Sequence, residues 1–168
     1  MSRVLPEDLS RLIDAVEAKT PLGADAPKGA WTRSALDGGT AMYANTNERL
    51  GISFSVARLA FPNIQAMDPR VIRIPAGKNN ELHRHAHESV FVVVAGEGEV
   101  RIGESWSPVR AGDVAFVPRW IFHQTRNTSP HTELIIVAVT DFGLTSAVLG
   151  DYDKRTRLAA GGSDSKPT

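Results

Sequence analysis

The stretch ELHRHAHESVFVVVAGEGEV, residues 81–100, decides the fold, because it joins a cluster of histidines to an apolar strand and a glycine-rich turn. The chain has five histidines, and three of them, His83, His85 and His87, alternate with other residues here. Residues two apart in a β-strand point to the same face of the sheet. His83 and His85 therefore project together, and Arg84 projects to the opposite face. The spacing predicts a strand that presents imidazole groups on one side.

The chain from residue 51 to residue 143 consists of short segments with β-strand character. Residues 52–61 (ISFSVARLAF) and 132–140 (TELIIVAVT) are two of them, and turns that contain glycine or proline separate the segments. Many short strands at this spacing predict a sandwich or a small barrel. The segments between them are too short for the crossover helices of a parallel sheet. We therefore expect residues 51–143 to form one all-β barrel domain.

Two extensions flank this domain. Residues 1–50 are expected to form an N-terminal arm, with a helix at 6–19 (PEDLSRLIDAVEAK), where apolar residues recur at helical spacing. Residues 20–45 are rich in Gly, Ala, Pro and Asp and predict a loop-dominated connection. Residues 144–168 predict a short C-terminal extension, either a helix or an arm. Its end, AAGGSDSKPT (159–168), is small and polar and is expected to be disordered.

The composition excludes several classes of function. The 19 Lys and Arg residues balance 19 Asp and Glu residues, so no basic field indicates a nucleic-acid partner. The absence of cysteine excludes disulfides and thiolate ligands, and leaves nitrogen and oxygen donors for any metal. No run reaches the roughly 18 apolar residues of a membrane span, and the charged start lacks the apolar core of a signal peptide. We expect a soluble, cytoplasmic protein without a membrane or nucleic-acid partner.

A second segment that contains a histidine completes a candidate metal site. His123 lies in WIFHQTRN, residues 120–127, which is another predicted strand. Two histidines at i and i+2, together with one from a neighbouring strand, can hold a metal ion from three sides. Neutral imidazole suits iron, zinc, copper, nickel and manganese. The alternative is a set of surface histidines at strand ends. His131, beside a Ser-Pro turn, lies outside both segments.

The glycines and prolines around these histidines carry a resemblance to the cupin superfamily over residues 70–140. The first set is Gly77-x5-His83-x-His85 followed by Gly96, and the second is Gly112-Asp113, Pro118 and His123-x3-Asn127. The resemblance implies a jelly-roll β-barrel with a metal ion held inside. In that superfamily the ligands are usually two histidines, a glutamate and a later histidine. The corresponding positions here are His83, His85, residue 89 and His123.

Residue 89 is a serine, where the superfamily pattern has a glutamate. Glu88 stands next to it, but a shift of one residue in a strand turns a side chain to the other face. Three alternatives stay open. The metal is held by three histidines alone, His87 serves as an additional ligand, or the site binds metal weakly or not at all. In the first case one coordination position is freed, and a chelating anionic substrate can fill it.

A closer resemblance points to oxygen chemistry. HRHxxxS with the GEG that follows, and Pro118-x-Trp120-x-Phe122-His123, are similar to gentisate-type ring-cleaving dioxygenases. Those enzymes use three histidines, Fe(II) and dioxygen to cleave hydroxylated aromatic acids, and they usually contain two cupin halves where this chain resembles one. The resemblance implies a non-haem Fe(II) dioxygenase for a small phenolic or organic-acid substrate. The alternatives are a non-oxidative cupin enzyme with Zn, Ni or Mn (a cyclase, isomerase, lyase or dehydratase), or a cupin that binds a small ligand without catalysis.

Four further residues are candidates for the wall of a pocket. Ser89 and Phe91 share one face of their strand. Arg73 and Arg101 lie in predicted strands, where an inward guanidinium would pair with a substrate carboxylate, although most strand arginines are solvated. The run VFVVVA, residues 90–95, has no polar alternation and predicts a strand buried on both faces. It favours a homodimer or a higher homo-oligomer, unless the N-terminal segment covers the strand.

Overall fold

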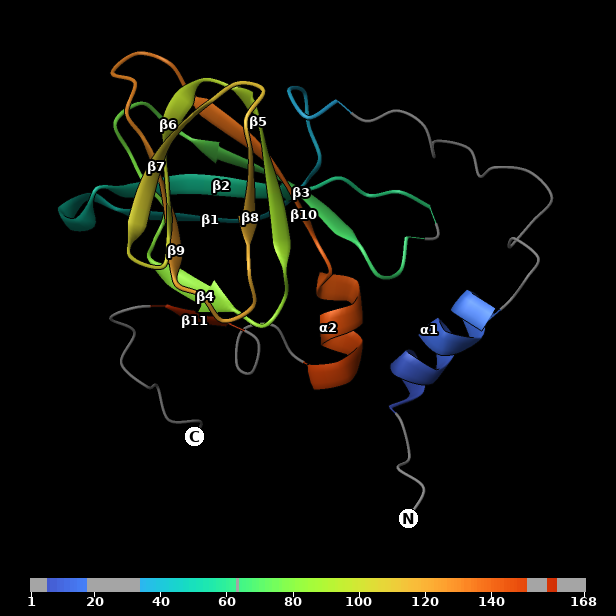
Figure 1. Cartoon of the computed structure of the whole chain (residues 1–168). Coiled ribbons are helices and arrows are strands. Elements are labelled where there is room, and N and C mark those ends of the chain that lie inside the picture. The colour runs from blue at the N-terminus through green and yellow to red at the C-terminus, as the bar shows by residue number, and fades with distance from the viewer. Residues whose placement is uncertain (1–5, 18–33, 63, 151–156, 160–168) are drawn as a thin grey trace.

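The computed structural model describes residues 6–17, 34–62, 64–150 and 157–159, and Figure 1 shows a β-barrel with two helices at one end. The helices are α1 (Glu7–Glu17) and α2 (Phe142–Leu149), with a short 3-10 turn η1 (Glu48–Leu50). The strands are β1 (Thr40–Asn47), β2 (Ile52–Arg58), β3 (Asp68–Ile74), β4 (His83–His85), β5 (Ser89–Ala95), β6 (Glu97–Ile102), β7 (Ser105–Arg110), β8 (Val114–Val117), β9 (His123–Asn127), β10 (Leu134–Thr140) and β11 (Arg157–Ala159).

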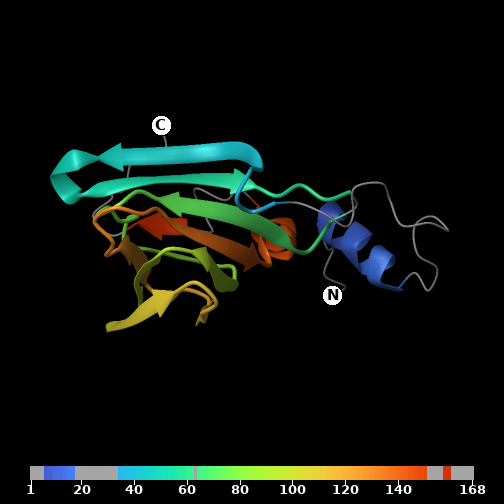
Figure 2. The same ribbon diagram turned by 90° about the horizontal axis from the view of Figure 1, so that it is seen from above.

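Two sheets face each other across the core (Figure 2). One has the strand order β1-β2-β3-β10-β5-β8, and the other has the order β11-β4-β9-β6-β7. Every strand pairing among the described residues is antiparallel. Phe54, Phe91 and Ile136 from the first sheet pack with Val100 from the second in one buried cluster. The arrangement confirms the prediction of an all-β jelly-roll barrel with an N-terminal helix and a short C-terminal extension.

Strand β5 shows how the alternation of side chains builds the barrel. Phe91 and Val93 point into the core and are buried. Val90 points outward and is 39% exposed, and its cross-strand partner Phe116 on β8 is 52% exposed. The outer face of this strand pair is therefore open to solvent. The prediction that residues 90–95 are buried on both faces is therefore wrong in the described chain, and the homo-oligomer that it favoured stays a prediction.

In the two segments that flank the barrel, the helices were expected from the sequence and the strands were not. α1 confirms the helix expected at residues 6–19, and α2 is the C-terminal helix. β1 corrects the loop-dominated connection expected at 20–45, because it pairs with β2 along its whole length. Its side chains are all exposed, so it lacks the apolar alternation by which a strand is recognised. β11 adds a further strand beside β4. Of the tail expected to be disordered, all but Ala159 lies outside the described residues.

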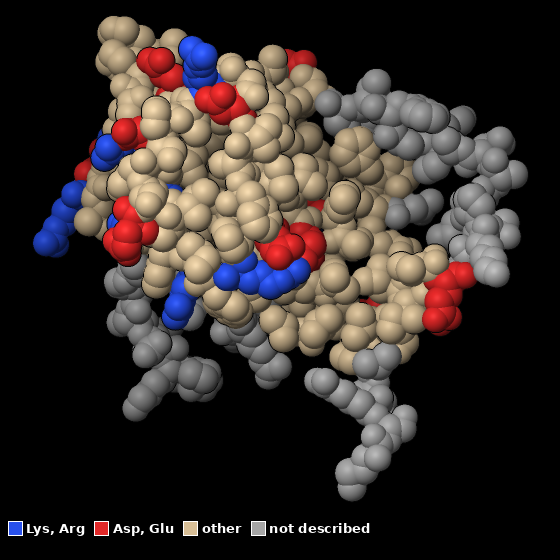
Figure 3. All heavy atoms as spheres, in the orientation of Figure 1, with Lys and Arg blue, Asp and Glu red and all other residues tan. Residues whose placement is uncertain are grey.

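The described surface mixes charges of both signs. On the face shown in Figure 3, the Lys and Arg side chains lie next to Asp and Glu side chains. Ion pairs of this kind join Arg126 to Glu99 and Arg119 to Asp141. This mixture agrees with the balanced composition. None of the helices that the structure describes combines the length and the apolar character needed to cross a membrane.

Candidate metal centre

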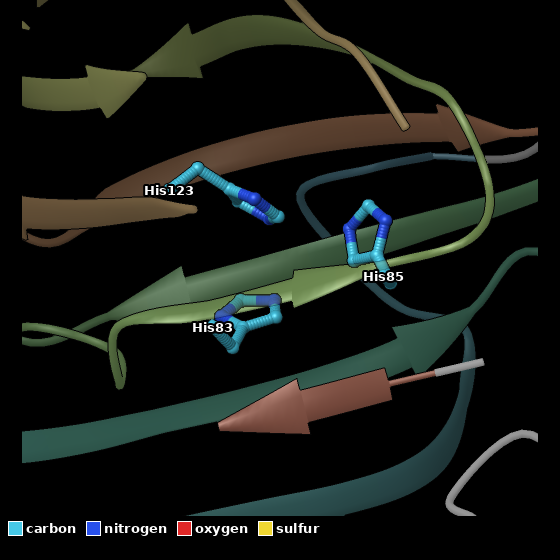
Figure 4. Close-up of side chains that lie close together, drawn as sticks. All are labelled: His83, His85 and His123. Atoms are coloured by element: carbon cyan, nitrogen blue, oxygen red, sulfur yellow. The ribbon is translucent and has the colours of Figure 1, made fainter. Parts of the chain in front are cut away.

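Three histidines from two neighbouring strands converge inside the barrel. His83 and His85 occupy the two ends of the three-residue strand β4, and the residue between them points away. His123 begins β9 and lies directly opposite His83 in the antiparallel pairing of β4 with β9. The ring nitrogens that face one another all lie within 4.8 Å. Figure 4 shows the three imidazoles pointing toward a common centre. A strand period of two and one cross-strand pair are sufficient to produce this arrangement.

The backbone fixes the orientation of each of these rings. Each Nδ1 lies within hydrogen-bonding distance of a backbone carbonyl two residues away. The pairs are His83 with Glu81, His85 with His87, and His123 with Ile121, at 2.9, 2.8 and 2.9 Å. A carbonyl oxygen only accepts, so each Nδ1 carries the proton and donates it. The Nε2 lone pair of each ring is then available as a metal ligand, and the hydrogen bond holds the ring in place.

Burial keeps the three imidazoles neutral. Desolvation lowers the pKa of His83 to about 4. Desolvation, reinforced by the neighbouring histidines, lowers the pKa of His85 and of His123 to about 2. Neutral imidazole is the form that binds metal ions. The Nε2 of His123 is buried and has no hydrogen-bond partner among the described residues, which is costly for a polar atom unless a ligand satisfies it. The three residues therefore fit a metal ion of the kind that nitrogen donors prefer.

His87 lies beside this group without joining it. Its ring is buried and stacks on that of His85, with the ring centroids 3.5 Å apart and the planes 8° from parallel. The cluster whose ligand atoms lie within 4.8 Å of one another contains His83, His85 and His123 and not His87. Among the described residues, the group that could hold a metal ion therefore consists of three histidines, and His87 lies in the wall of the adjoining cavity.

Ser89 occupies the position where a carboxylate would complete the ligand set. Its hydroxyl is buried and has no hydrogen-bond partner in the described part of the chain. The neighbouring Glu88 points outward, with a side chain that is 48% exposed and lies 3.5 Å from Arg119. Strand alternation therefore keeps the available carboxylate out of the barrel. The cluster carries no anionic ligand among the described residues.

A narrow cavity of about 30 Å³ adjoins the three histidines. Ser89 and Phe91 line it, as their positions on β5 predict. Arg73 and Arg101, which were expected at the pocket wall, are not part of it. Arg73 pairs with Glu133 at 2.7 Å, and Arg101 pairs with Glu104 at 2.7 Å. Each guanidinium points away from the histidines, because its residue belongs to the set of alternate residues that face outward from the strand.

The sequence reasoning missed Arg70, which does line the cavity and is 4% exposed. Arg70 and Arg73 stand three residues apart in β3, and therefore on opposite faces. Arg70 lies on the same face of β3 as Ile72 and Ile74, and this pattern could have identified it as the inward-facing arginine, because Ile74 is fully buried. That signal is weak, because Val71 on the other face is buried as well.

An ion pair outside the cavity supports the loop that joins β4 to β5. Arg119 donates from Nη1 to the carbonyl of Ala86 at 2.8 Å, and Asp141 accepts from the backbone N–H of Glu88 at 2.8 Å. Arg119 and Asp141 also bond to each other. Partial burial would raise the pKa of Asp141, but the hydrogen bonds from Arg119 and from the Glu88 backbone outweigh it and lower that pKa. The two residues hold the loop whose His87 carbonyl orients the ring of His85, a candidate metal ligand.

Replacing Arg119 with glutamine should therefore weaken metal binding. We expect a loss of at most about tenfold, because Arg119 supports the loop without contacting a candidate ligand, whereas removing a direct hydrogen-bond partner of a metal ligand costs about 10- to 100-fold. The measurement is competition for Zn(II) with a chromophoric chelator. Arg126→Gln is the matched control, since it removes an ion pair of similar exposure on β9. Equal affinities for the two variants would show that the loop needs no such support.

Comparison with known proteins agrees with the fold and with the position of the site. Residues 70–140 match the cupin domain family, and this span contains all three histidines. An uncharacterized protein of Streptomyces coelicolor is 26% identical over 81 residues, which are 48% of this chain and 77% of that protein. A cupin 2 conserved barrel domain protein from Rhodopseudomonas palustris is 27% identical, with a TM-score of 0.54 and coverage of 69% of this chain and 73% of that one.

An enzyme of known activity shares the fold at lower identity. Salicylate 1,2-dioxygenase from Pseudoaminobacter salicylatoxidans, in a structure with gentisate, is 17% identical with a TM-score of 0.57. The match covers 65% of this chain and 29% of the dioxygenase. This likeness is one of fold, and the match extends over less than a third of the longer enzyme.

Proposed function

We propose that this chain, whose residues 70–140 form a cupin domain, is a non-haem Fe(II) dioxygenase for a small phenolic or organic-acid substrate. The observation that carries the proposal is the cluster of His83, His85 and His123 without a carboxylate. Three neutral ligands leave coordination positions for a substrate and for dioxygen. When bound there, iron would supply the redox chemistry. Resemblance to the gentisate-type enzymes, which also use three histidines, supports this choice of reaction.

The chain's own residues would bind the substrate and shield it from water. The three Nδ1–H groups are committed to backbone carbonyls, so each imidazole keeps one orientation during turnover. The rings of Phe54 and Phe91 line the cavity and exclude water from its walls. Ser89 offers a neutral hydroxyl at the position of the missing carboxylate, which leaves room for an anionic substrate oxygen. The protein would thus supply position and electrostatics, and the metal the oxidative chemistry.

Oxygen consumption tests the proposal. Protein reconstituted anaerobically with Fe(II) is expected to consume dioxygen when it is mixed with a suitable member of a panel of phenols and organic acids, as measured with an oxygen electrode. The same protein loaded with Zn(II) should consume none, because zinc has no redox chemistry. If iron-loaded protein with stoichiometric metal never consumes oxygen across the panel, the dioxygenase proposal is wrong.

The same ligand set leaves a second candidate function. Imidazole donors suit Zn(II), Ni(II) and Mn(II) as well as Fe(II), and a metal of this kind acts as a Lewis acid in non-oxidative chemistry. A cyclase, isomerase, lyase or dehydratase would turn over without dioxygen. Conversion of a substrate by the Zn(II)-loaded protein under anaerobic conditions would favour this candidate. Tight ligand binding without any turnover would favour a cupin that only binds its ligand.

A further inference from the structure

We propose that Tyr43 closes the mouth of the cavity beside the three histidines and sets the size of the ligand that reaches a metal ion held there. The inference rests on the proposed function, because it assumes that the histidines hold a metal ion, but it does not depend on the reaction. Three observations carry it: the exposure of Tyr43 among the cavity walls, the irregular strand that aims it inward, and the small volume of the cavity.

Tyr43 lies between the cavity and the solvent. It belongs to the walls of the cavity, together with His83, His85 and His123. Among the described residues that line this cavity, Tyr43 alone is exposed, with 38% of its surface accessible, and the others are buried or half-buried. The cavity wall therefore meets the solvent at Tyr43, and a ligand would enter past its ring.

An irregularity in β1 aims Tyr43 into the barrel. Ala41 pairs with Ala57 of β2. The next pair along the strands joins Tyr43 to Val56, so Met42 is an extra residue in β1. Residues directly opposite each other in a sheet present their side chains on the same face, and Val56 belongs to the buried core cluster. Without the extra residue, Met42 would stand opposite Val56 and Tyr43 would face outward. A β-bulge can redirect a side chain in this way next to a functional site.

The Tyr43 ring can move without disturbing the core. It meets the ring of Phe54 edge to face, with 5.9 Å between the ring centroids. β1 is the outermost strand of its sheet (Figure 2), and all of its side chains are exposed. Exposed side chains change rotamer readily. Rotation about the Cα–Cβ bond of Tyr43 would therefore uncover Phe54 and the cavity, and it would displace no buried side chain of β1.

The closed cavity is too small for a ring-shaped ligand. Its volume of about 30 Å³ compares with roughly 150 Å³ for an apolar cavity that admits benzene. The other aromatic walls, Phe54 and Phe91, are buried in the core cluster, where close packing resists movement. Tyr43 is therefore the aromatic wall that can yield to a larger ligand, and its side chain limits what fits beside the metal ion.

Ligand binding to Co(II)-loaded protein tests this role without turnover. The probes are imidazole and 4-phenylimidazole, which offer the metal the same kind of nitrogen donor and differ by one phenyl ring. The visible absorption of the bound Co(II) gives both affinities. In Tyr43→Ala the phenyl ring can occupy the space of the removed side chain, against Phe54. We expect the affinity for 4-phenylimidazole relative to imidazole to rise about tenfold or more over the wild type, the order expected for burying a phenyl ring.

Matched variants assign the change to the ring of Tyr43. Tyr43→Phe keeps the ring and should retain the wild-type affinity ratio. Met42→Ala removes a neighbouring side chain of similar exposure, 36%, that is not among the described residues lining the cavity, and should retain the ratio as well. Thermal unfolding shows whether each variant is folded, and Tyr43→Leu replaces Tyr43→Ala if the latter is not. A folded Tyr43→Ala or Tyr43→Leu variant with the wild-type ratio, or an equal rise in Met42→Ala, would overturn the proposal.

Metal content in the same samples separates this inference from the proposed function. Wild-type protein that cannot retain Co(II) would contradict the three-histidine site itself, and the inference would fall with it. A closed mouth makes the larger probe the weaker ligand of the wild type. Wild-type protein that retains Co(II) and binds 4-phenylimidazole more tightly than imidazole would therefore overturn the role of Tyr43, even without a folded variant, and would leave the dioxygenase proposal standing.

Discussion

The double variant His83→Ala/His123→Ala is expected to lose essentially all of its bound metal. The structure offers three candidate ligands, and this variant keeps only His85. Protein zinc sites built on four ligands bind with about 10–16 kcal/mol in total, so removing two of three ligands should lower the affinity by more than about a thousandfold. Elemental analysis after purification without added metal measures the result. The metal found in the wild type also discriminates between iron, zinc, nickel and manganese.

Two single variants make this experiment specific. His131→Ala removes an exposed histidine outside the cluster and should leave the metal content unchanged. His87→Ala removes a buried histidine that stacks on His85 but does not belong to the ligand group. We expect this variant to retain its metal, with a modest loss of affinity from the lost packing. Metal loss in His87→Ala as complete as in the double variant would show that His87 is a ligand.

The histidine cluster was largely predictable, because strand geometry is periodic. His83 and His85 share a face in any β-strand, and the sequence alone places them there. That His123 lies opposite His83 depends on the pairing of β4 with β9, which local sequence does not encode. The carbonyl partners of the three Nδ1 atoms also follow from loop conformations that no residue pattern reveals. The convergence of the histidines was therefore predictable, but the orientation of their rings was not.

The residues that line the cavity were less predictable, because their identity depends on which face of each strand points into the barrel. In β3, apolar residues occupy both faces, so the sequence does not show whether Arg70 or Arg73 points inward. β1 was not predicted for the opposite reason. All of its side chains are exposed, so its sequence lacks the alternation of apolar and polar residues that identifies a strand. Both errors arise where the tertiary arrangement, rather than local propensity, determines burial.

The second large effect is expected on the stability of the fold, when Asn127 is replaced. It is buried, and its Nδ2 donates to the carbonyls of Ile74 and Thr132 at 2.9 and 2.8 Å. Its Oδ1 accepts from the backbone N–H of Ser129 at 2.9 Å. The side chain thus joins the end of β9 to the end of β3 and to the turn that leads into β10. An amide is required, because this position needs two donated bonds and one accepted bond at once.

Asn127→Asp should lower the free energy of unfolding by about 3–5 kcal/mol at pH 7, because it removes both donors and places a carboxylate against two carbonyl oxygens. Urea unfolding followed by circular dichroism measures the loss. Asn47→Asp is the matched control, since the exposed Asn47 side chain only accepts, from the N–H of Leu50 at 3.3 Å. A carboxylate accepts equally well there, so the control should change stability by less than about 0.5 kcal/mol. Similar losses in the two variants would mean that the donated bonds of Asn127 do not hold the barrel strands together.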